Sequence, residues 1–205
     1  MRKFIGTKLT LILFLLSFQS VLANAVPANS TPSDVVENLH QTLIQVMKEA
    51  KDLDFSSRYK ILEPVINESF DFDTIARIVM GRYWKKLDDQ QKAEFIDTFS
   101  RLSISTYTAQ FDSFSGETFE VLGDKEMKKG RILVKTKLIT DDRVVPFNYV
   151  LHPVKDRWRI INVIADGISD LSLKRSDYST IMKTEGFDEL VRKLREKIKS
   201  SGKEP

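Results

Sequence analysis

Few side chains in this sequence of 205 residues could carry out acid–base, nucleophilic or metal chemistry. The chain has two histidines, His40 and His152, and no cysteine, which removes thiolate nucleophiles, thiolate metal ligands and disulfides. The sequence also lacks a G-x-S-x-G motif, an H-E-x-x-H motif and a glycine-rich phosphate loop. We therefore expect no catalytic residue, no metal site and no cofactor, and we expect both histidines to be exposed or hydrogen-bonded rather than ligands.

Apolar and aromatic side chains are what the sequence supplies in quantity. It contains 13 Phe, 5 Tyr and 2 Trp, and 41% of its residues are hydrophobic. Such a composition favours binding by burial of apolar surface over chemistry at a reactive group. The elements that position these side chains therefore decide what the protein can bind.

The first 25 residues have the layout of a cleavable export signal. Arg2, Lys3 and Lys8 precede an apolar run over residues 9–16, and Ala23-Asn24-Ala25 provides a small-x-small cleavage site. The run is about half as long as a membrane-spanning helix needs to be. An uncleaved membrane helix is the alternative interpretation. We expect a mature protein of one domain, residues 26–205, outside the cytoplasm.

The charge of the mature chain argues against nucleic acid as a partner. The full sequence has 32 basic and 29 acidic residues, but residues 1–25 hold three basic residues and no acidic one. The mature chain would therefore carry 29 of each and a net charge of zero. A nucleic-acid-binding surface needs a local excess of Lys and Arg, so we expect no nucleic acid to bind.

Helical periodicity dominates the chain from residue 31 to residue 111. A first amphipathic helix is predicted over residues 31–50, and a second one follows, which Pro64 should kink or end. A short helix stops at Gly81. The longest helix is predicted to begin at Asp88, where Asp88-Asp89-Gln90-Gln91 has the spacing of a capping box.

The period then changes from 3.6 to 2, which predicts strands. Short connections between them favour an antiparallel meander, and two helices, over residues 172–184 and 187–200, end the chain. The last strand has apolar residues on both faces, so its inner side is not assigned. The pattern predicts an α+β fold with helices over one face of a four-stranded antiparallel sheet. The predicted strands are residues 118–122, 131–140, 144–152 and 157–165.

Two interpretations are open for Asp166-Gly167-Ile168-Ser169, which follows the last strand. The glycine could let the strand bend beside a binding site. Alternatively, the segment is a strand-to-helix turn in which Ser169 or Asp170 caps the next helix.

Six short stretches between Phe70 and Leu194 occur in the order of a known family. They are Phe72-Asp73-Thr74-Ile75-Ala76-Arg77, Met80-Gly81-Arg82-Tyr83-Trp84, Leu87-Asp88-Asp89-Gln90-Gln91, Trp158-Arg159-Ile160-Ile161-Asn162-Val163, Asp166-Gly167-Ile168-Ser169 and Gly186-Phe187-Asp188-Glu189-Leu190. With them the sequence resembles the MlaC family of periplasmic lipid-binding proteins. The segment Ala109–Glu117 is most similar to the subgroup called HpnM, which is associated with hopanoid transport.

The resemblance implies that the sheet and its helices enclose an apolar cavity. It implies a soluble carrier that takes a phospholipid or hopanoid between an inner-membrane transporter complex and an outer-membrane lipoprotein complex, with transient membrane contact. We expect such a carrier to be a monomer. The family offers no catalytic residues. Asn162 departs from the family pattern, where many relatives have Asp, which puts in doubt any role that needs a charge there.

Candidate lipid-binding residues come from the apolar side of the predicted sheet and from the helices opposite. Tyr and Trp suit the edge of such a cavity because each joins an apolar ring to a polar group. Each of these residues could equally belong to an ordinary packed core. The candidates are Val79, Tyr83, Trp84, Phe99, Leu102, Val134, Phe147, Tyr149, Ile161 and Val163.

Two other classes of function fit the same sequence. One is a ligand-free adaptor between membrane complexes, which would have a solid core without an apolar cavity. The other is an enzyme on a cone-shaped α+β scaffold of the NTF2-like kind. An enzyme would need a buried Asp or Glu with a shifted pKa that faces a partner, and the sequence alone shows no such pair.

Overall fold

The computed structural model describes residues 30–202, and the predicted export signal lies outside these residues. Helices come first, strands next and helices last, as the sequence pattern predicted. The order is α1 (Pro32–Lys48), α2 (Phe55–Ser69), α3 (Phe72–Met80), the 3-10 helix η1 (Gly81–Lys86), α4 (Asp89–Gln110), β1 (Thr118–Met127), η2 (Lys128–Gly130), β2 (Arg131–Ile139), β3 (Val144–Val154), β4 (Arg157–Ala165), β5 (Ile168–Ser169), α5 (Asp170–Thr184) and α6 (Phe187–Ser201).

The helices begin at the polar residues that the sequence marks as caps. Thr31 and Asp34 form a capping box at the start of α1, and Asp88 and Gln91 form another at the start of α4. α2 continues past Pro64 to Ser69, so the expectation that Pro64 would end the helix was wrong, and a kink there stays a prediction. Pro64 is exposed, so water can reach the carbonyl of Lys60 that loses its amide donor.

The sheet has five strands, not four, in the order β1-β2-β3-β4-β5 with every neighbouring pair antiparallel. The extra strand, β5, is two residues long and pairs with Ile164 and Ala165. It is too short to give a repeating pattern in the sequence. Asp166 and Gly167 reverse the chain before it, with φ angles of 51° and 78°. Ser169 then caps α5 by accepting a hydrogen bond from the Ser172 amide, which confirms the turn interpretation.

β1 is also longer than predicted, because it runs to Met127 rather than Leu122. The pairing register with β2 shifts between Val121 and Gly123, and Gly123 adopts the φ of 125° that this bulge uses. The residues after the bulge are exposed on an edge strand, and Asp124, Lys125 and Glu126 are charged, so apolar alternation is lost there. The turn to β2 therefore shrinks to Lys128–Gly130.

A second bulge explains why both faces of β4 looked apolar. Val150 pairs with Asn162 and Leu151 with Ile160, which leaves Ile161 as an extra residue in β4. Ile160 and Ile161 are exposed by 0% and 1%, so two consecutive side chains are buried where regular alternation would expose one.

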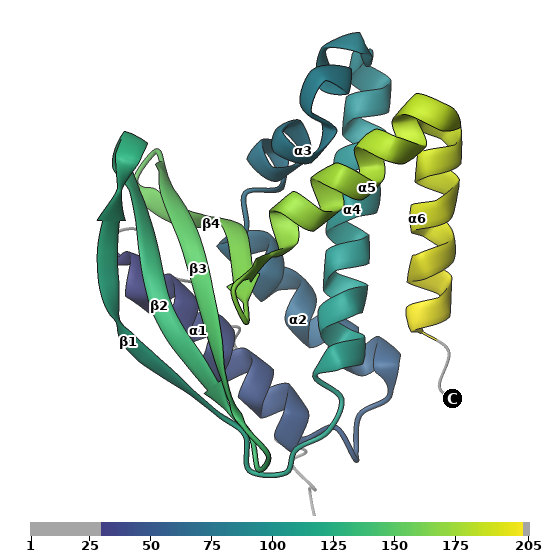
Figure 1. Cartoon of the computed structure of the whole chain (residues 1–205). Helices are drawn as coiled ribbons and strands as arrows, with labels where there is room; N and C mark the ends of the chain where they lie inside the picture. Colours follow the sequence, from purple (N-terminus) through teal and green to yellow (C-terminus); the bar gives the residue numbers. More distant parts are fainter. Residues whose placement is uncertain (1–29, 203–205) are drawn as a thin grey trace, which may run out of the picture.

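Figure 1 shows the helices on one side of the sheet. α1 contacts β1, β2 and β4, whereas α2, α3 and α5 contact only β4 among the strands to which they are closely packed. α4 lies behind α3 and α5, and α6 packs against α4 on the side away from the sheet. The core is one continuous cluster with two regions, one under α1 and one between β4 and the group formed by α3, α4 and α5. Among residues 30–202, no helix is both long and apolar enough to cross a bilayer.

Candidate functional site

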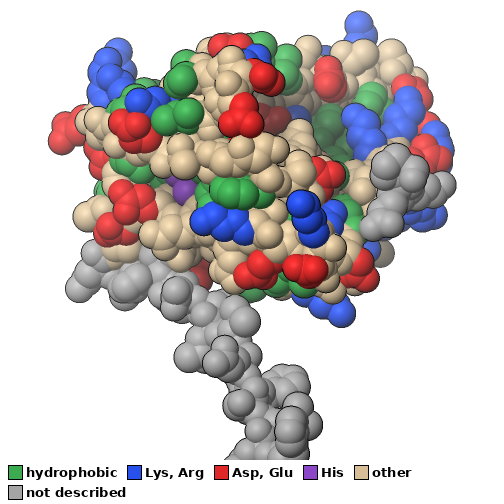
Figure 2. Space-filling view, turned by 90° about the horizontal axis from the view of Figure 1, so that it is seen from below, with side chains coloured by type: hydrophobic (Ala, Val, Ile, Leu, Met, Phe, Trp, Pro, Cys, Tyr) green, Lys and Arg blue, Asp and Glu red, His purple; other side chains and the backbone are tan. Residues whose placement is uncertain are grey.

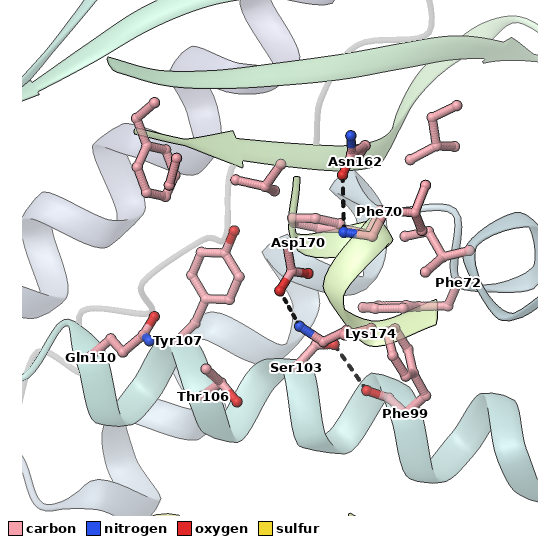
Figure 3. A pocket seen from close by; sticks show the side chains of 16 residues that line it. Phe70, Phe72, Phe99, Ser103, Thr106, Tyr107, Gln110, Asn162, Asp170 and Lys174 are labelled. Carbon is pink, nitrogen blue, oxygen red and sulfur yellow. Dashed lines mark hydrogen bonds and ion pairs between the residues drawn. The ribbon is translucent and has the colours of Figure 1, made fainter. Parts of the chain in front are cut away.

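A pocket of about 280 Å³ lies between β4 and the helices α3, α4 and α5 (Figure 3). Its lining combines an aromatic floor, an aliphatic wall on the sheet and a polar rim. We define the floor as Phe70, Phe72, Ile75 and Phe99, the sheet wall as Phe147, Ile161, Val163 and Ala165, and the rim as Ser103, Thr106, Gln110, Asp170 and Lys174; Tyr107, Asn162 and Leu171 complete the lining.

The floor forms where the chain reverses between α2 and α3. Phe70 directly follows α2 and Phe72 begins α3, with Asp71 between them as the N-cap. The Phe70 and Phe72 rings stack at 5.8 Å, and the edge of one of the Phe72 and Phe99 rings meets the face of the other at 6.1 Å. All three rings are buried. Their contacts give the pocket a rigid apolar base.

The sheet wall comes from neighbouring strands. Phe147 on β3 pairs with Ala165 on β4, and Val163 pairs with Tyr149 one step along. The bulge at Ile161 turns that side chain inward as well. Phe147, Val163 and Ala165 remain partly exposed because they border the pocket instead of packing against a helix.

The rim contains the charged and hydroxyl groups of the site. Ser103 and Thr106 donate hydrogen bonds to carbonyls of their own helix, at 2.9 Å to Phe99 O and 2.8 Å to Leu102 O. Lys174 forms an ion pair with Asp170, one turn earlier on α5. Gln110 and Asp170 are exposed, which places the mouth of the pocket between the end of α4 and the start of α5.

Asn162 has a structural role at this site. Its Oδ1 accepts hydrogen bonds from the Leu171 amide at 3.2 Å and from Ser169 Oγ at 3.1 Å. These bonds tie the start of α5 to β4. A neutral side chain therefore serves as a cap at the position where the family resemblance suggested an acid.

Tyr107 places a hydroxyl inside the pocket. Its ring stacks on Phe111 at 5.7 Å and meets Phe70 edge to face at 5.9 Å. Figure 3 shows the hydroxyl directed from α4 toward the sheet. Burial, and to a smaller extent the charge of Asp170, raises the pKa of Tyr107 well above its usual value, so the hydroxyl stays protonated.

Four of the ten predicted lining residues meet at this pocket, namely Phe99, Phe147, Ile161 and Val163. Val79, Leu102, Val134 and Tyr149 lie in the packed core instead. Tyr83 and Trp84 lie on η1; the Tyr83 hydroxyl accepts a hydrogen bond from Arg82 at 3.0 Å, and Trp84 packs half-buried against the core.

Sequence reasoning missed the rest of the lining. Phe70 and Phe72 flank the capping residue Asp71, and this aromatic pair was a usable signal. The polar rim gave no signal in the sequence. Its residues Asp170 and Lys174 come from α5, a helix with little separation of apolar and polar faces. Tyr107 lies eight residues after Phe99 on the longest predicted helix, but helical spacing alone does not reveal which residues border a hollow.

A second, wider groove lies between α1 and the start of β1. Its volume is about 540 Å³, it is more open to solvent, and its lining includes Gln45, Lys48, Glu49 and Glu117. The Lys48 ammonium lies 5.3 Å from the centre of the exposed Phe114 ring. We regard the smaller pocket as the binding site because its lining is mostly aromatic and aliphatic and more enclosed.

The groove and the pocket are separated by a set of packed rings. His40 stacks on Phe119 at 3.9 Å and hydrogen-bonds to the Tyr149 hydroxyl at 3.0 Å, while Phe147 lies 6.0 Å from Phe119 and 5.6 Å from Tyr149. Burial lowers the pKa of His40 to about 3, so it is neutral at pH 7. His40 is thus a hydrogen-bonded core residue.

The structure places one acid–base pair at a fold junction. His152 Nε2 lies 2.8 Å from Asp71 Oδ2, and the same carboxylate caps α3 by accepting from the Thr74 amide at 2.9 Å. Although burial opposes it, hydrogen bonding to Thr74 and His152 leaves the pKa of Asp71 lowered. Asp71 does not line the pocket, so this pair joins β3 to α3. Within residues 30–202, no three His, Asp or Glu side chains are grouped to hold a metal.

The sequence of this chain also matches a known protein family. The family model described as "MlaC protein" matches residues 37–196, which is most of the chain. The chain belongs to the MlaC family. The resemblance found in the sequence motifs is confirmed, whereas the match does not distinguish the HpnM subgroup.

Curated MlaC relatives are distant in sequence. Toluene tolerance protein ttg2D of Pseudomonas putida is 26% identical over 166 residues, covering 78% of this chain and 77% of that protein. The intermembrane phospholipid transport system binding protein MlaC of Haemophilus influenzae is 21% identical over 123 residues, covering 58% of each. The chain thus spans less than two thirds of the second relative.

A solved structure shares the fold of this MlaC-family chain. The phospholipid-binding protein from Ralstonia solanacearum, determined in complex with a phospholipid, superposes with a TM-score of 0.73. The match covers 87% of this chain and all of the other at 17% sequence identity. At that identity the likeness establishes the fold and leaves the ligand to be argued from the pocket.

Proposed function

We propose that this protein is a periplasmic carrier that shelters the apolar part of a phospholipid and moves it between an inner-membrane transporter complex and an outer-membrane lipoprotein complex. The observation that carries the proposal is the pocket between β4 and α3–α5, with its aromatic floor and aliphatic sheet wall. The phospholipid in the names of a relative and of the solved structure supports the same ligand. A ligand-free adaptor would need no such hollow.

Binding and releasing a lipid requires burial of hydrocarbon but no reactive group. Burial of one methylene is worth about 0.8 kcal/mol, so two sixteen-carbon chains represent roughly 20–25 kcal/mol of gross transfer from water. A membrane already shelters the same hydrocarbon, so extraction into the pocket is nearly balanced. The affinity can therefore stay low enough for release.

The pocket must enlarge to hold a lipid. Its volume of about 280 Å³ is at the lower end for small-molecule sites, which span roughly 300–1,000 Å³. A two-chain lipid is larger than most of the ligands that such sites hold. We propose that the sheet moves away from α3–α5 during loading. The contacts that would resist this include the His152–Asp71 pair, the Arg157–Glu68 pair at 2.8 Å and the bond from Arg159 to Asn67 O at 2.8 Å.

A hopanoid is the second candidate ligand. The segment that resembles the HpnM subgroup, residues 109–117, includes Gln110 on the rim and Phe111, which stacks on Tyr107. The start of this segment thus lies at the mouth of the proposed site. We propose that the carrier works as a monomer with transient membrane contact, whichever of the two lipids it holds.

The test is to purify the protein from the periplasm of a Gram-negative host and to extract its lipid for mass spectrometry. The wild type is expected to carry close to one lipid per protein. In Ala165→Trp a large side chain fills the pocket between the sheet wall and the rim, and we expect bound lipid to fall at least tenfold. Val144→Trp is the matched control, because Val144 is 57% exposed and lies outside the pocket.

Repeated absence of lipid from the wild type, together with no transfer of lipid between vesicles, would overturn the carrier. Equal lipid in wild type and Ala165→Trp would place the ligand elsewhere in the molecule.

A further inference from the structure

A cluster of basic side chains lies at the end of the helical layer where α3 joins α4 (Figure 1). Residues 74–87 contain four basic residues and no acidic one, although the mature chain is expected to carry no net charge. We define the basic cluster as Arg82, Lys85 and Lys86 of η1 together with Arg175 of α5. All four residues are exposed, and within residues 30–202 none of them forms an ion pair.

The backbone of Gly81 brings Arg175 next to η1. Gly81 has a φ of 52°, and a Cβ at this position would lie 3.3 Å from Arg175 Nη2. Glycine therefore allows both the turn from α3 into η1 and the close approach of α5. Charges from two elements that are far apart in the sequence thus share one surface.

Two cations of η1 lie beside an aromatic ring instead of a carboxylate. Arg82 Cζ and Lys86 Nζ lie 5.0 and 5.8 Å from the centre of the buried Tyr83 ring. Arg82 also donates a hydrogen bond to the Tyr83 hydroxyl at 3.0 Å. A ring stabilises a cation without neutralising its charge, so the cluster keeps its positive potential.

The first acidic residues after η1 already have partners. Asp88 caps α4 by accepting a hydrogen bond from the Gln91 amide at 2.8 Å, and Asp89 pairs with Lys92 at 3.0 Å. The mutual repulsion of the four cations is therefore left for an anionic partner to relieve.

The composition of this surface favours a bilayer over a protein as that partner. Stable protein interfaces have an apolar core, but the exposed large apolar side chains of residues 30–202 include none on α3 or η1. Anionic headgroups instead form a surface of negative potential, which attracts every Lys or Arg close to it. An anionic lipid surface therefore matches a cluster that offers mainly charge.

We propose that the basic cluster docks the protein on the surface of an anionic phospholipid bilayer. This inference rests on the proposed carrier function for its purpose and specifies the membrane contact. The cluster lies beside the start of α4 and the pocket mouth at its end, and the 22 residues of α4 span about 33 Å. Figure 2 shows the mouth end, where acidic and basic side chains are interspersed. Docking thus turns the mouth away from the bilayer, toward a protein complex that exchanges the lipid.

The test measures flotation of protein purified from the periplasm with vesicles of phosphatidylcholine, alone or mixed with phosphatidylglycerol. The wild type is expected to bind only the anionic vesicles, and raising NaCl from about 50 mM to about 500 mM should release it, because salt screens the attraction. The triple variant Arg82→Gln/Lys85→Gln/Lys86→Gln should lower the partition coefficient about tenfold or more, and Arg175→Gln about threefold.

The matched control makes the same change of charge elsewhere. Lys51, Lys197 and Lys199 are exposed and form no ion pair in the part of the chain that the structure describes. Lys51→Gln/Lys197→Gln/Lys199→Gln should bind the anionic vesicles like the wild type. All variants should carry as much lipid as the wild type, because none of the substituted residues lines the pocket.

The orientation on the bilayer is measurable because the chain has no cysteine, so that one introduced thiol can be labelled. A fluorescent donor is attached to Gln90→Cys, beside the cluster, or to Ser113→Cys, beyond the end of α4, and both positions are exposed. With an acceptor on the lipid headgroups, energy transfer should be stronger from Gln90→Cys. Equal or stronger transfer from Ser113→Cys would overturn the proposed orientation.

A lipid-carrying wild type that does not bind the anionic vesicles would overturn the inference and leave the carrier function standing, with an acidic protein as the remaining partner for the cluster. Equal binding by the wild type and the triple variant would also overturn it. A wild type that binds the vesicles but neither carries nor transfers lipid would instead overturn the carrier and leave the docking surface in place.

Discussion

The two regions of the core each contain a tyrosine, but the surroundings of its hydroxyl differ between them. Under α1, the Tyr149 hydroxyl hydrogen-bonds to His40 and its side chain is 0% exposed. Between β4 and α3–α5, the Tyr107 ring is equally fixed by neighbouring rings, but its hydroxyl borders a hollow. The Tyr149 hydroxyl thus has its partner inside the protein, whereas the Tyr107 hydroxyl faces a hollow that a ligand could fill.

This difference separates residues that hold the fold from residues that we propose bind the lipid. Completed packing gives stability, whereas a hollow lined by apolar side chains gives up stability that a ligand can restore. The α1 half therefore serves as the scaffold, and the α3–α5 half as the adaptable side. The substitutions below test this contrast from the largest expected effect to the smallest.

The largest contrast should come from truncating the two tyrosines. Tyr149→Ala is expected to lower the free energy of unfolding by about 3–5 kcal/mol, because it opens a cavity in closed packing. Tyr107→Ala should cost about 1–2 kcal/mol, since its space joins an existing pocket. Denaturant unfolding of the lipid-free proteins measures both. Equal losses would show that the two halves are packed alike.

The pH dependence of stability should show that His40, in the half of the core under α1, is buried and neutral. The pKa of His40 is lowered by burial to about 3, so between pH 3 and 6.5 the unfolded chain binds a proton that the folded chain does not. Stability from this group is therefore lost as pH falls, by about 2.5 kcal/mol between pH 7 and 4.5. His40→Gln should flatten this dependence in denaturant unfolding at each pH. An unchanged slope in the variant would contradict the buried, neutral state of His40.

Asn162 should show a smaller effect at the junction between sheet and pocket. Asn162→Ala removes the acceptor for the Leu171 amide and should cost about 1 kcal/mol of unfolding free energy. Asn162→Asp keeps an acceptor near the start of α5, where negative charge is favourable, and should change stability by less than about 0.5 kcal/mol. Thermal unfolding of the two variants makes the comparison. A loss in Asn162→Asp as large as that in Asn162→Ala would show that the neutral amide itself is required.

The sequence predicted the closed half of the molecule better than the open half. Helix caps such as Thr31 and Asp88 have local signatures, and the alternation of β2 and β3 identified their buried faces. The bulge at Ile161 and the two-residue β5 depend on pairing between strands, so no local pattern reports them. These two features also shape the wall of the pocket.

The candidate site was predicted in part for a related reason. Phe99 and Phe147 were identified because the stripe of α4 and the inner face of β3 are periodic, whereas Ile161 and Val163 come from a strand whose inner side the pattern left open. Periodicity marks a residue as facing inward, but it does not distinguish packed core from the edge of a hollow, as Val134 and Tyr149 show. Rim residues such as Lys174 lie partly exposed, so their contribution follows only from the spatial arrangement of α4 and α5.

The most direct test of the central claim is to locate a bound lipid by photocrosslinking. A photoreactive phenylalanine analogue replaces Phe147 in the pocket wall or, as the comparison, Phe114 in the groove beside α1. After irradiation of protein purified from the periplasm, mass spectrometry of the intact chain detects an added lipid mass. We predict the adduct at Phe147 and none at Phe114. An adduct at Phe114 with none at Phe147 would contradict a lipid site between β4 and α3–α5.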